Sequence, residues 1–117
     1  MYGLPEDFDG SFLVGRTLEL VCFAQYQVRL HFGPDVDISI ESSFEYGMRD
    51  RRSLVDRPNV KTSWLMKFLG LSVSSVAAAR DGTLTLRFED DSWITCYDPT
   101  PQYEAYRIRN GDSEIRV

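Results

Sequence analysis

The sequence predicts a mostly β protein built from two diverged copies of one three-strand unit. Two observations support this prediction: apolar and polar residues alternate with a period of two over several short segments, and the same order of segments recurs in the second half of the chain. Alternation of this kind is typical of strands with one buried and one solvated face. A recurring order of such strands indicates an internal repeat.

The two copies align when Gly15 is placed on Gly70 and one extra residue is allowed at the turn Asp81-Gly82. With that alignment, apolar positions agree through two consecutive strands and the turn between them. We therefore expect a single domain over residues 1–117, with repeat units at about 13–46 and 68–106 and a connector at 47–62.

Each copy is expected to form a three-stranded antiparallel meander. The strands are placed near residues 17–24, 27–32 and 36–41 in the first copy, and near 72–79, 83–88 and 92–97 in the second. Packing the two units face to face would bury both apolar faces, as a six-stranded sandwich or a partly closed barrel. One continuous sheet of all six strands, covered by a helix, is the alternative.

One short helix is expected near residues 63–69. Thr62 is a candidate N-cap, apolar residues up to Phe68 follow at helical spacing, and Gly70 is a natural stop. A shorter turn of the same kind is expected at residues 8–15.

Composition and charge disfavour several classes of function. The chain has 18 Asp and Glu against 13 Lys and Arg, a formal net charge of -5, which argues against broad nucleic-acid binding and favours a basic protein partner. The longest apolar stretches, near 18–24 and 65–71, are too short to cross a bilayer. Two cysteines without a C-x-x-C spacing, and a start without the basic and apolar parts of a secretion signal, predict a reduced, cytoplasmic protein.

No catalytic, metal or cofactor constellation stands out, so we expect a protein without enzymatic activity, cofactor or metal. His31, the single histidine, has the parity of an outward-facing strand residue. Cys22 and Cys96 lie within predicted strands and are interpreted as small core residues. The acidic clusters at 35–37 and 89–91 lack the spacing of a calcium loop and are interpreted as turn residues.

One difference between the copies favours a binding surface. The outward positions of the third strand are Asp37, Ser39 and Glu41 in the first copy, and Trp93, Thr95 and Tyr97 in the second. Large aromatic residues do not normally replace acids on a solvated face, so something is expected to cover this one. The candidates are the short helix or the C-terminal segment of this chain, or a second protein.

Arginines of the connector and tyrosines near the C-terminus are further candidates. The basic residues at 49–61 could bind an acidic group, although Asp50 and Asp56 could neutralise them. Segment 103–106 resembles segment 44–46, which favours a structural corner. The predicted partner-binding residues are Trp93, Thr95, Tyr97, Tyr103, Tyr106, Arg49, Arg51 and Arg52.

A family resemblance rests on Leu69-Gly70, on residues 81–90 and on Tyr103-Glu104-Ala105-Tyr106-Arg107-Ile108. The chain resembles, from about Leu13 to Ile108, a family of small bacterial domains of unknown function that end in a Tyr-Glu-Ser-Trp-like motif followed by Ile. It departs from that pattern at Asp91, where a glycine is expected, and at Ala105-Tyr106. The resemblance implies a bacterial source and no known activity. In size and acidity the chain is also similar to toxin-immunity proteins.

These observations predict an acidic, non-enzymatic protein-interaction module, immunity-like or regulatory, that acts by occluding a partner protein. The partner is an unidentified protein, with a basic one favoured and a homodimer as the other option; nucleic acid and membrane are not expected. The alternative function is that of a small-molecule-binding β domain that uses the interior between the two repeat units.

Overall fold

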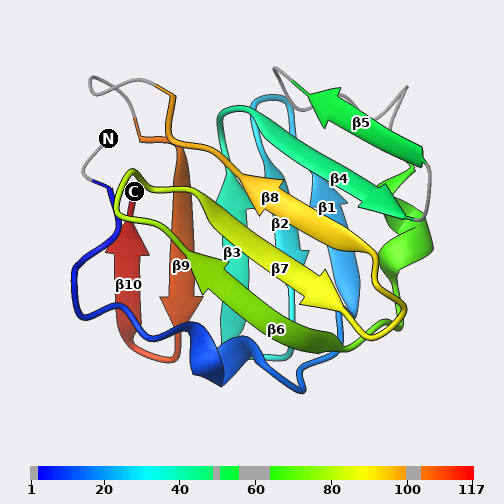
Figure 1. The fold of residues 1–117 in the computed structure, drawn as a ribbon, viewed down its shortest axis with the longest axis horizontal. Coiled ribbons are helices and arrows are strands. Elements are labelled where there is room, and N and C mark those ends of the chain that lie inside the picture. The colour runs from blue at the N-terminus through cyan, green and yellow to red at the C-terminus, as the bar shows by residue number, and fades with distance from the viewer. Residues whose placement is uncertain (1–2, 49–50, 56–63, 100–103) are drawn as a thin grey trace.

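The computed structural model describes residues 3–48, 51–55, 64–99 and 104–117. They form ten strands in two five-stranded antiparallel sheets that pack face to face (Figure 1). The first sheet has the order β1 (Leu20–Phe23), β2 (Val28–His31), β3 (Val36–Ile40), β9 (Tyr106–Asn110) and β10 (Ser113–Arg116). The second has the order β5 (Arg51–Val55), β4 (Phe44–Met48), β8 (Trp93–Cys96), β7 (Leu84–Phe88) and β6 (Val73–Ala78). The predicted mostly β sandwich is confirmed.

Each copy contributes one meander, β1-β2-β3 or β6-β7-β8, with the same strand order in both. The structure adds a hairpin to each meander and places it on the opposite sheet. Hairpin β4-β5 of the first copy pairs with β8, and hairpin β9-β10 of the second pairs with β3. This exchange gives β3 and β8 a strand partner on both sides, so the edges that remain open are those of β1, β10, β5 and β6. It also explains why ten strands are present where six were predicted.

Residues 47–62 were predicted to form a connector, but those of them that the structure describes lie in two strands. Gly47 and Met48 complete β4, and residues 51–55 form β5. Strand β5 is an edge strand that carries arginine on both of its sides, so it lacks the alternation by which the inner strands can be recognised. Residues 56–62 lie outside the described part of the chain.

The two copies meet symmetrically at Thr17 and Ser72, which form an isolated antiparallel bridge and whose hydroxyl oxygens lie 2.9 Å apart. Matching hydrogen bonds cross this point in both directions: Gly15 N–H donates to the Val73 carbonyl (2.7 Å), and Gly70 N–H donates to the Leu18 carbonyl (2.8 Å). Gly15 and Gly70 therefore hold equivalent places about a pseudo-twofold axis that passes between Thr17 and Ser72.

The predicted helix at 63–69 is a single 3-10 turn, η3 (Leu65–Phe68), and the expected shorter turn in the first copy is η1 (Gly10–Leu13). Both are followed by a glycine in the left-handed region, Gly15 at φ 85° and Gly70 at φ 89°. A side chain is disfavoured in this conformation, so these glycines end the turns and start the first strands. The N-cap candidate Thr62 lies outside the described residues.

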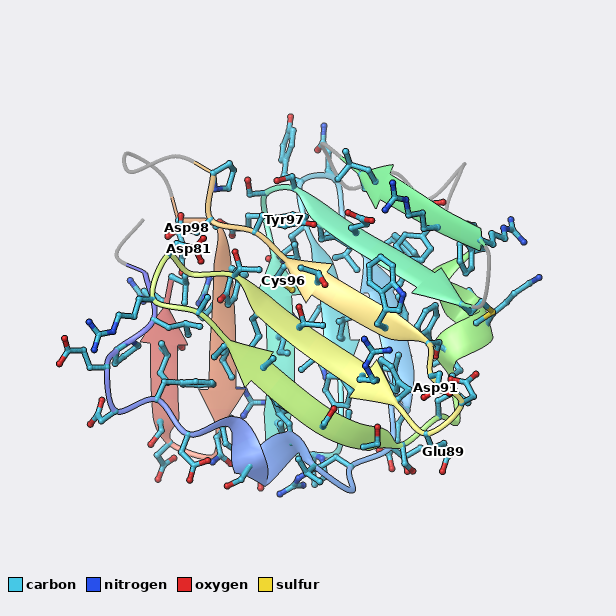
Figure 2. The ribbon with its side chains drawn as sticks, in the orientation of Figure 1. Asp81, Glu89, Asp91, Cys96, Tyr97 and Asp98 are labelled. Atoms are coloured by element: carbon cyan, nitrogen blue, oxygen red, sulfur yellow. The ribbon has the colours of Figure 1, made fainter. Side chains whose placement is uncertain are left out.

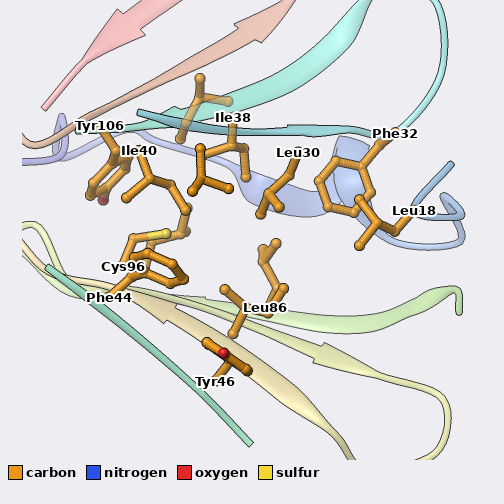
Figure 3. Packing of buried hydrophobic residues seen from close by; sticks show 14 of the residues in the cluster. Leu18, Leu30, Phe32, Ile38, Ile40, Phe44, Tyr46, Leu86, Cys96 and Tyr106 are labelled. Atoms are coloured by element: carbon orange, nitrogen blue, oxygen red, sulfur yellow. The ribbon is translucent and has the colours of Figure 1, made fainter. Parts of the chain in front are cut away.

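The core lies between the sheets and takes side chains from both (Figure 3). Leu30 and Phe32 from the first copy and Leu86 and Phe88 from the second are buried together, as their alternation predicts. Turn η3 closes one side of this core, because Phe68 meets Phe88 edge to face with the ring centroids 5.3 Å apart.

One of the two cysteine predictions is wrong. Cys96 is fully buried, as expected, and burial raises the pKa of its thiol to about 12. Cys22, in contrast, is exposed. Its neighbour Val21 faces the core, and successive side chains on a strand point to opposite faces. Both thiols are free.

Two turns of the second meander lie at opposite ends of the sheet, marked in Figure 2 by Asp81 and by Asp91. At the first turn Gly82 has φ 96°, and the Asp81 carboxylate accepts a hydrogen bond from Thr83 N–H (2.9 Å). At the second, Asp91 has φ 70° and is the single non-glycine residue of the described chain with a positive φ. This is the position at which the resemblance led us to expect glycine, and aspartate tolerates the left-handed region better than most residues.

Candidate functional site

Trp93, Thr95 and Tyr97 come together on the outer face of the second sheet, as their alternation with buried Ile94 and Cys96 requires. Strand pairing surrounds them with outward residues of β4 and β7 and of the edge strand β5. We call this surface the aromatic face, made of Glu45, Gly47, Arg52, Leu54, Thr85, Arg87, Trp93, Thr95 and Tyr97.

The indole of Trp93 lies against the backbone of strand β4 at Gly47. A Cβ atom added at Gly47 would come within 2.7 Å of Trp93 Cζ2, which is closer than real carbon atoms approach. The absence of a side chain at this position therefore lets a large ring lie flat on the sheet. Trp93 remains partly exposed in this position.

Tyr97 is held by a chain of polar contacts. Its hydroxyl donates to Glu45 Oε2 (2.9 Å), and Arg52 Nη1 lies 3.6 Å from Glu45 Oε1. Burial, together with the hydrogen bond to the ionised Glu45, raises the pKa of the Tyr97 hydroxyl. The phenol ring is therefore fixed in one orientation on the aromatic face.

The two intramolecular covers predicted for this face do not lie on it. Trp64 and Phe68, at η3, point into the interior, where both rings contact Tyr46 at centroid distances of 4.6 and 6.0 Å. The C-terminal segment from Tyr106 onward forms strands of the other sheet. In Figure 1 no described segment crosses the outer side of β4, β8 and β7.

The predicted partner-binding residues fall into four groups. Arg52 shares the aromatic face with Trp93, Thr95 and Tyr97. Arg51 points to the other side of β5, with its guanidinium 4.3 Å from the centroid of the Trp64 ring. Tyr106 is 0% exposed and its hydroxyl donates to a backbone carbonyl inside the protein, so its inclusion as a surface residue is a correction. Arg49 and Tyr103 lie outside the described residues.

The predicted match between segments 44–46 and 103–106 is shifted in the structure. Tyr106 opposes Ile40, and Phe44 opposes Cys96, so Phe44 and Tyr106 hold equivalent places in the two copies. Glu45 consequently corresponds to Arg107 rather than to Glu104. The cause is the longer loop that precedes β9, which changes the spacing between the third and fourth strands of the second copy.

The outer face of the first sheet carries a second cluster, which sequence reasoning did not find. Asp37 and Ser39, predicted to face solvent, are only 7% and 4% exposed. Arg109 contacts Asp37 Oδ2 through Nε (2.7 Å) and Nη2 (2.6 Å), and Arg29 Nε donates to Ser39 Oγ (3.2 Å). We call this surface the polar face. His31 lies on it, next to Arg29, in its predicted outward orientation.

Neither face offers a metal centre: no group of three potential ligands among His, Cys, Asp and Glu is arranged to hold an ion within the described residues. No helix in the same part of the chain is long and apolar enough to span a membrane.

The chain belongs to a family of unknown function (DUF6188), which matches residues 11–117. The predicted resemblance to a domain family of unknown function is confirmed, and the match continues beyond the predicted limit at Ile108 to the end of the chain. No curated protein and no solved structure matches the chain significantly.

Proposed function

We propose that this chain is a non-enzymatic protein-interaction module, immunity-like or regulatory, which binds a basic protein in the cytoplasm through its aromatic face and acts by occluding that partner. One observation carries the proposal: Trp93 and Tyr97 lie on an outer sheet face that no described segment of the chain covers. Tryptophan and tyrosine are the residue types that contribute most often to the binding energy of protein interfaces.

The aromatic face is also ordered before any partner binds. Trp93 rests against Gly47, and Tyr97 is hydrogen-bonded to Glu45. Side chains that are already fixed lose little conformational entropy on association, which favours binding. At the margin of the face, Leu54 is 65% exposed and adds apolar area that a partner can bury.

Charge favours a basic partner over a second copy of the chain. Two copies would each carry a net charge of -5 and repel one another at long range. A partner of opposite charge would be attracted, which raises the association rate and helps to select the correct partner.

The alternative function, small-molecule binding between the repeat units, has less support. The described interior between the sheets is filled by packed side chains such as Leu30, Ile38 and Leu86, each of which is fully buried (Figure 3). A ligand there would have to displace core side chains, which interiors of normal packing density resist.

The proposal is tested by affinity capture from host lysate with the double variant Trp93→Thr/Tyr97→Thr. Threonine suits a strand and avoids placing a second carboxylate beside Glu45. We expect the wild type to capture a basic protein in about a one-to-one molar ratio, and the double variant to capture none of it. Circular dichroism should show that the double variant remains folded, because both side chains are partly exposed.

The matched control is Leu20→Thr/Tyr26→Thr, which removes one aliphatic and one aromatic side chain from exposed positions outside the aromatic face. This control should capture the partner as the wild type does. Equal capture by the Trp93→Thr/Tyr97→Thr protein, or capture of an acidic protein, would contradict the proposal.

A further inference from the structure

The polar face contains a row of three residues in register across neighbouring strands. Arg29 on β2, Ser39 on β3 and Arg107 on β9 are direct partners in the two strand pairings. Neighbouring strands lie about 4.8 Å apart, so the two arginines stand on either side of a short serine side chain. The result is a depression of about 260 Å³ over Ser39, which is also lined by His31, Asp37, Arg109 and Glu114.

The two arginines of this row retain free hydrogen-bond donors. The described side-chain partner of Arg29 is the neutral hydroxyl of Ser39. Arg107 is shared between two carboxylates: its Nε lies 3.5 Å from Glu104 Oε1 and its Nη1 lies 3.7 Å from Glu114 Oε1, and neither the buried Nε nor the buried Glu104 Oε1 makes a hydrogen bond in the described structure. Both contacts are longer than an ordinary hydrogen bond, so Arg107 keeps donors that a closer acceptor can take.

Strands β2, β3, β9 and β10 and the residues next to them carry equal numbers of arginines and carboxylates on this face. Four arginines (Arg29, Arg107, Arg109 and Arg116) stand with four carboxylates (Asp37, Glu41, Glu104 and Glu114). The face is therefore less acidic than the chain as a whole, whose net charge is -5. Arg107 and Arg116 are direct cross-strand partners, and they share one carboxylate, because Glu114 Oε1 lies 3.7 Å from Arg107 Nη1 and 2.9 Å from Arg116 Nε.

We propose that the depression over Ser39 binds a small oxyanion, the phosphate or carboxylate group of a small molecule, between the guanidinium groups of Arg29 and Arg107. The planar guanidinium matches both kinds of oxyanion through paired N–H donors. The volume is slightly below that of pockets for drug-sized ligands, which suits a single anionic group. The site lies on the opposite sheet from the aromatic face and does not depend on the proposed function.

Titration by NMR with inorganic phosphate, and separately with acetate, tests this site. Sodium chloride keeps the ionic strength constant, so that screening does not change. We expect saturable shifts of the His31 ring signals and of the backbone amides around Ser39. Saturation with phosphate alone assigns the site to phosphate compounds, and saturation with acetate alone assigns it to carboxylates. Shifts that stay linear with both anions would overturn the proposal.

The variant Arg29→Thr gives the first copy the residue that the second copy has at the equivalent position, Thr85. It should weaken the binding of the titrated anion about tenfold or more, because a charge-assisted hydrogen bond is lost. The control Arg80→Thr makes the same charge change at a side chain that is 85% exposed and distant from the site, and should alter the affinity by less than about twofold.

Equal weakening by the two variants would show a general charge effect and overturn the site. If Arg29→Thr lowers the melting temperature, Arg107→Gln provides a second variant of the same depression. It removes the charge and keeps a polar side chain on β9. Unchanged anion affinity in a folded Arg107→Gln protein would likewise contradict the proposal.

Discussion

Truncation of Phe88 to alanine is expected to lower the free energy of unfolding by about 3 to 5 kcal/mol. Phe88 is fully buried, and its ring contacts Phe68 edge to face. Removing the ring would leave a cavity between the second sheet and η3, because densely packed neighbours collapse only partly into such a space. The expected loss is a large share of the ~5 to 15 kcal/mol that stabilises a typical domain. Urea titration followed by circular dichroism measures it.

Two further substitutions test whether this loss comes from the core. Phe32→Ala, at the equivalent position of the first copy, should also be strongly destabilising, because Phe32 is buried in the same core. His31 precedes Phe32 in the sequence but lies on the polar face. His31→Ala should therefore change the free energy of unfolding by less than about 0.5 kcal/mol. A similar loss for His31→Ala and Phe88→Ala would show that the assignment of inner and outer strand faces is wrong.

The second large effect expected is a loss of stability at alkaline pH. Burial raises the pKa of the Cys96 thiol from 9.0 to about 12. Between these values the unfolded chain has lost the thiol proton while the folded protein keeps it. Each pH unit in that window should therefore lower the free energy of unfolding by about 1.4 kcal/mol. Below pH 9.0 the thiol is protonated in both states and contributes nothing.

Tyr106 should steepen the same loss above pH 10.0, because burial also raises the pKa of its hydroxyl. The two cysteines provide a matched pair of variants for urea titrations between about pH 7 and pH 11 under reducing conditions. Cys96→Ala should show a shallower dependence on pH than the wild type. Cys22→Ala should leave the dependence unchanged, because Cys22 is exposed. The opposite pattern would contradict the assignment of the buried thiol.

The strands that the sequence predicts well are those with one buried and one solvated face. Segments 28–32 and 84–88 alternate clearly for this reason. Edge strand β5 could not be predicted, because arginines on both of its sides interrupt the alternation. Hairpin β9-β10 does alternate, with Ile108, Ile115 and Val117 on the inner side, so its two strands were within reach of the sequence pattern. The position of strand β3 was predicted correctly, but the burial of its outer side was not predicted. All five of its residues are buried.

The two faces differ in how far the sequence could reveal them. Trp93 and Tyr97 are conspicuous because the first copy has acidic residues, Asp37 and Glu41, at the aligned positions. This comparison needs only the two copies within one chain. The contact of Arg109 with Asp37 joins residues 72 positions apart and depends on which sheet hairpin β9-β10 enters. Local residue patterns do not determine that choice, which depends on the packing of the whole molecule.

Site-specific photo-crosslinking in the native host tests the aromatic face most directly. A photoreactive residue would replace Leu54 in one protein and Arg116 in another; both positions are exposed, lie on edge strands and are equivalent in the two copies. We predict one discrete adduct from position 54 and none from position 116. The adduct should disappear when Trp93→Thr/Tyr97→Thr is added. An adduct from position 116 alone, or one from position 54 that survives the loss of Trp93 and Tyr97, would contradict partner binding through this face.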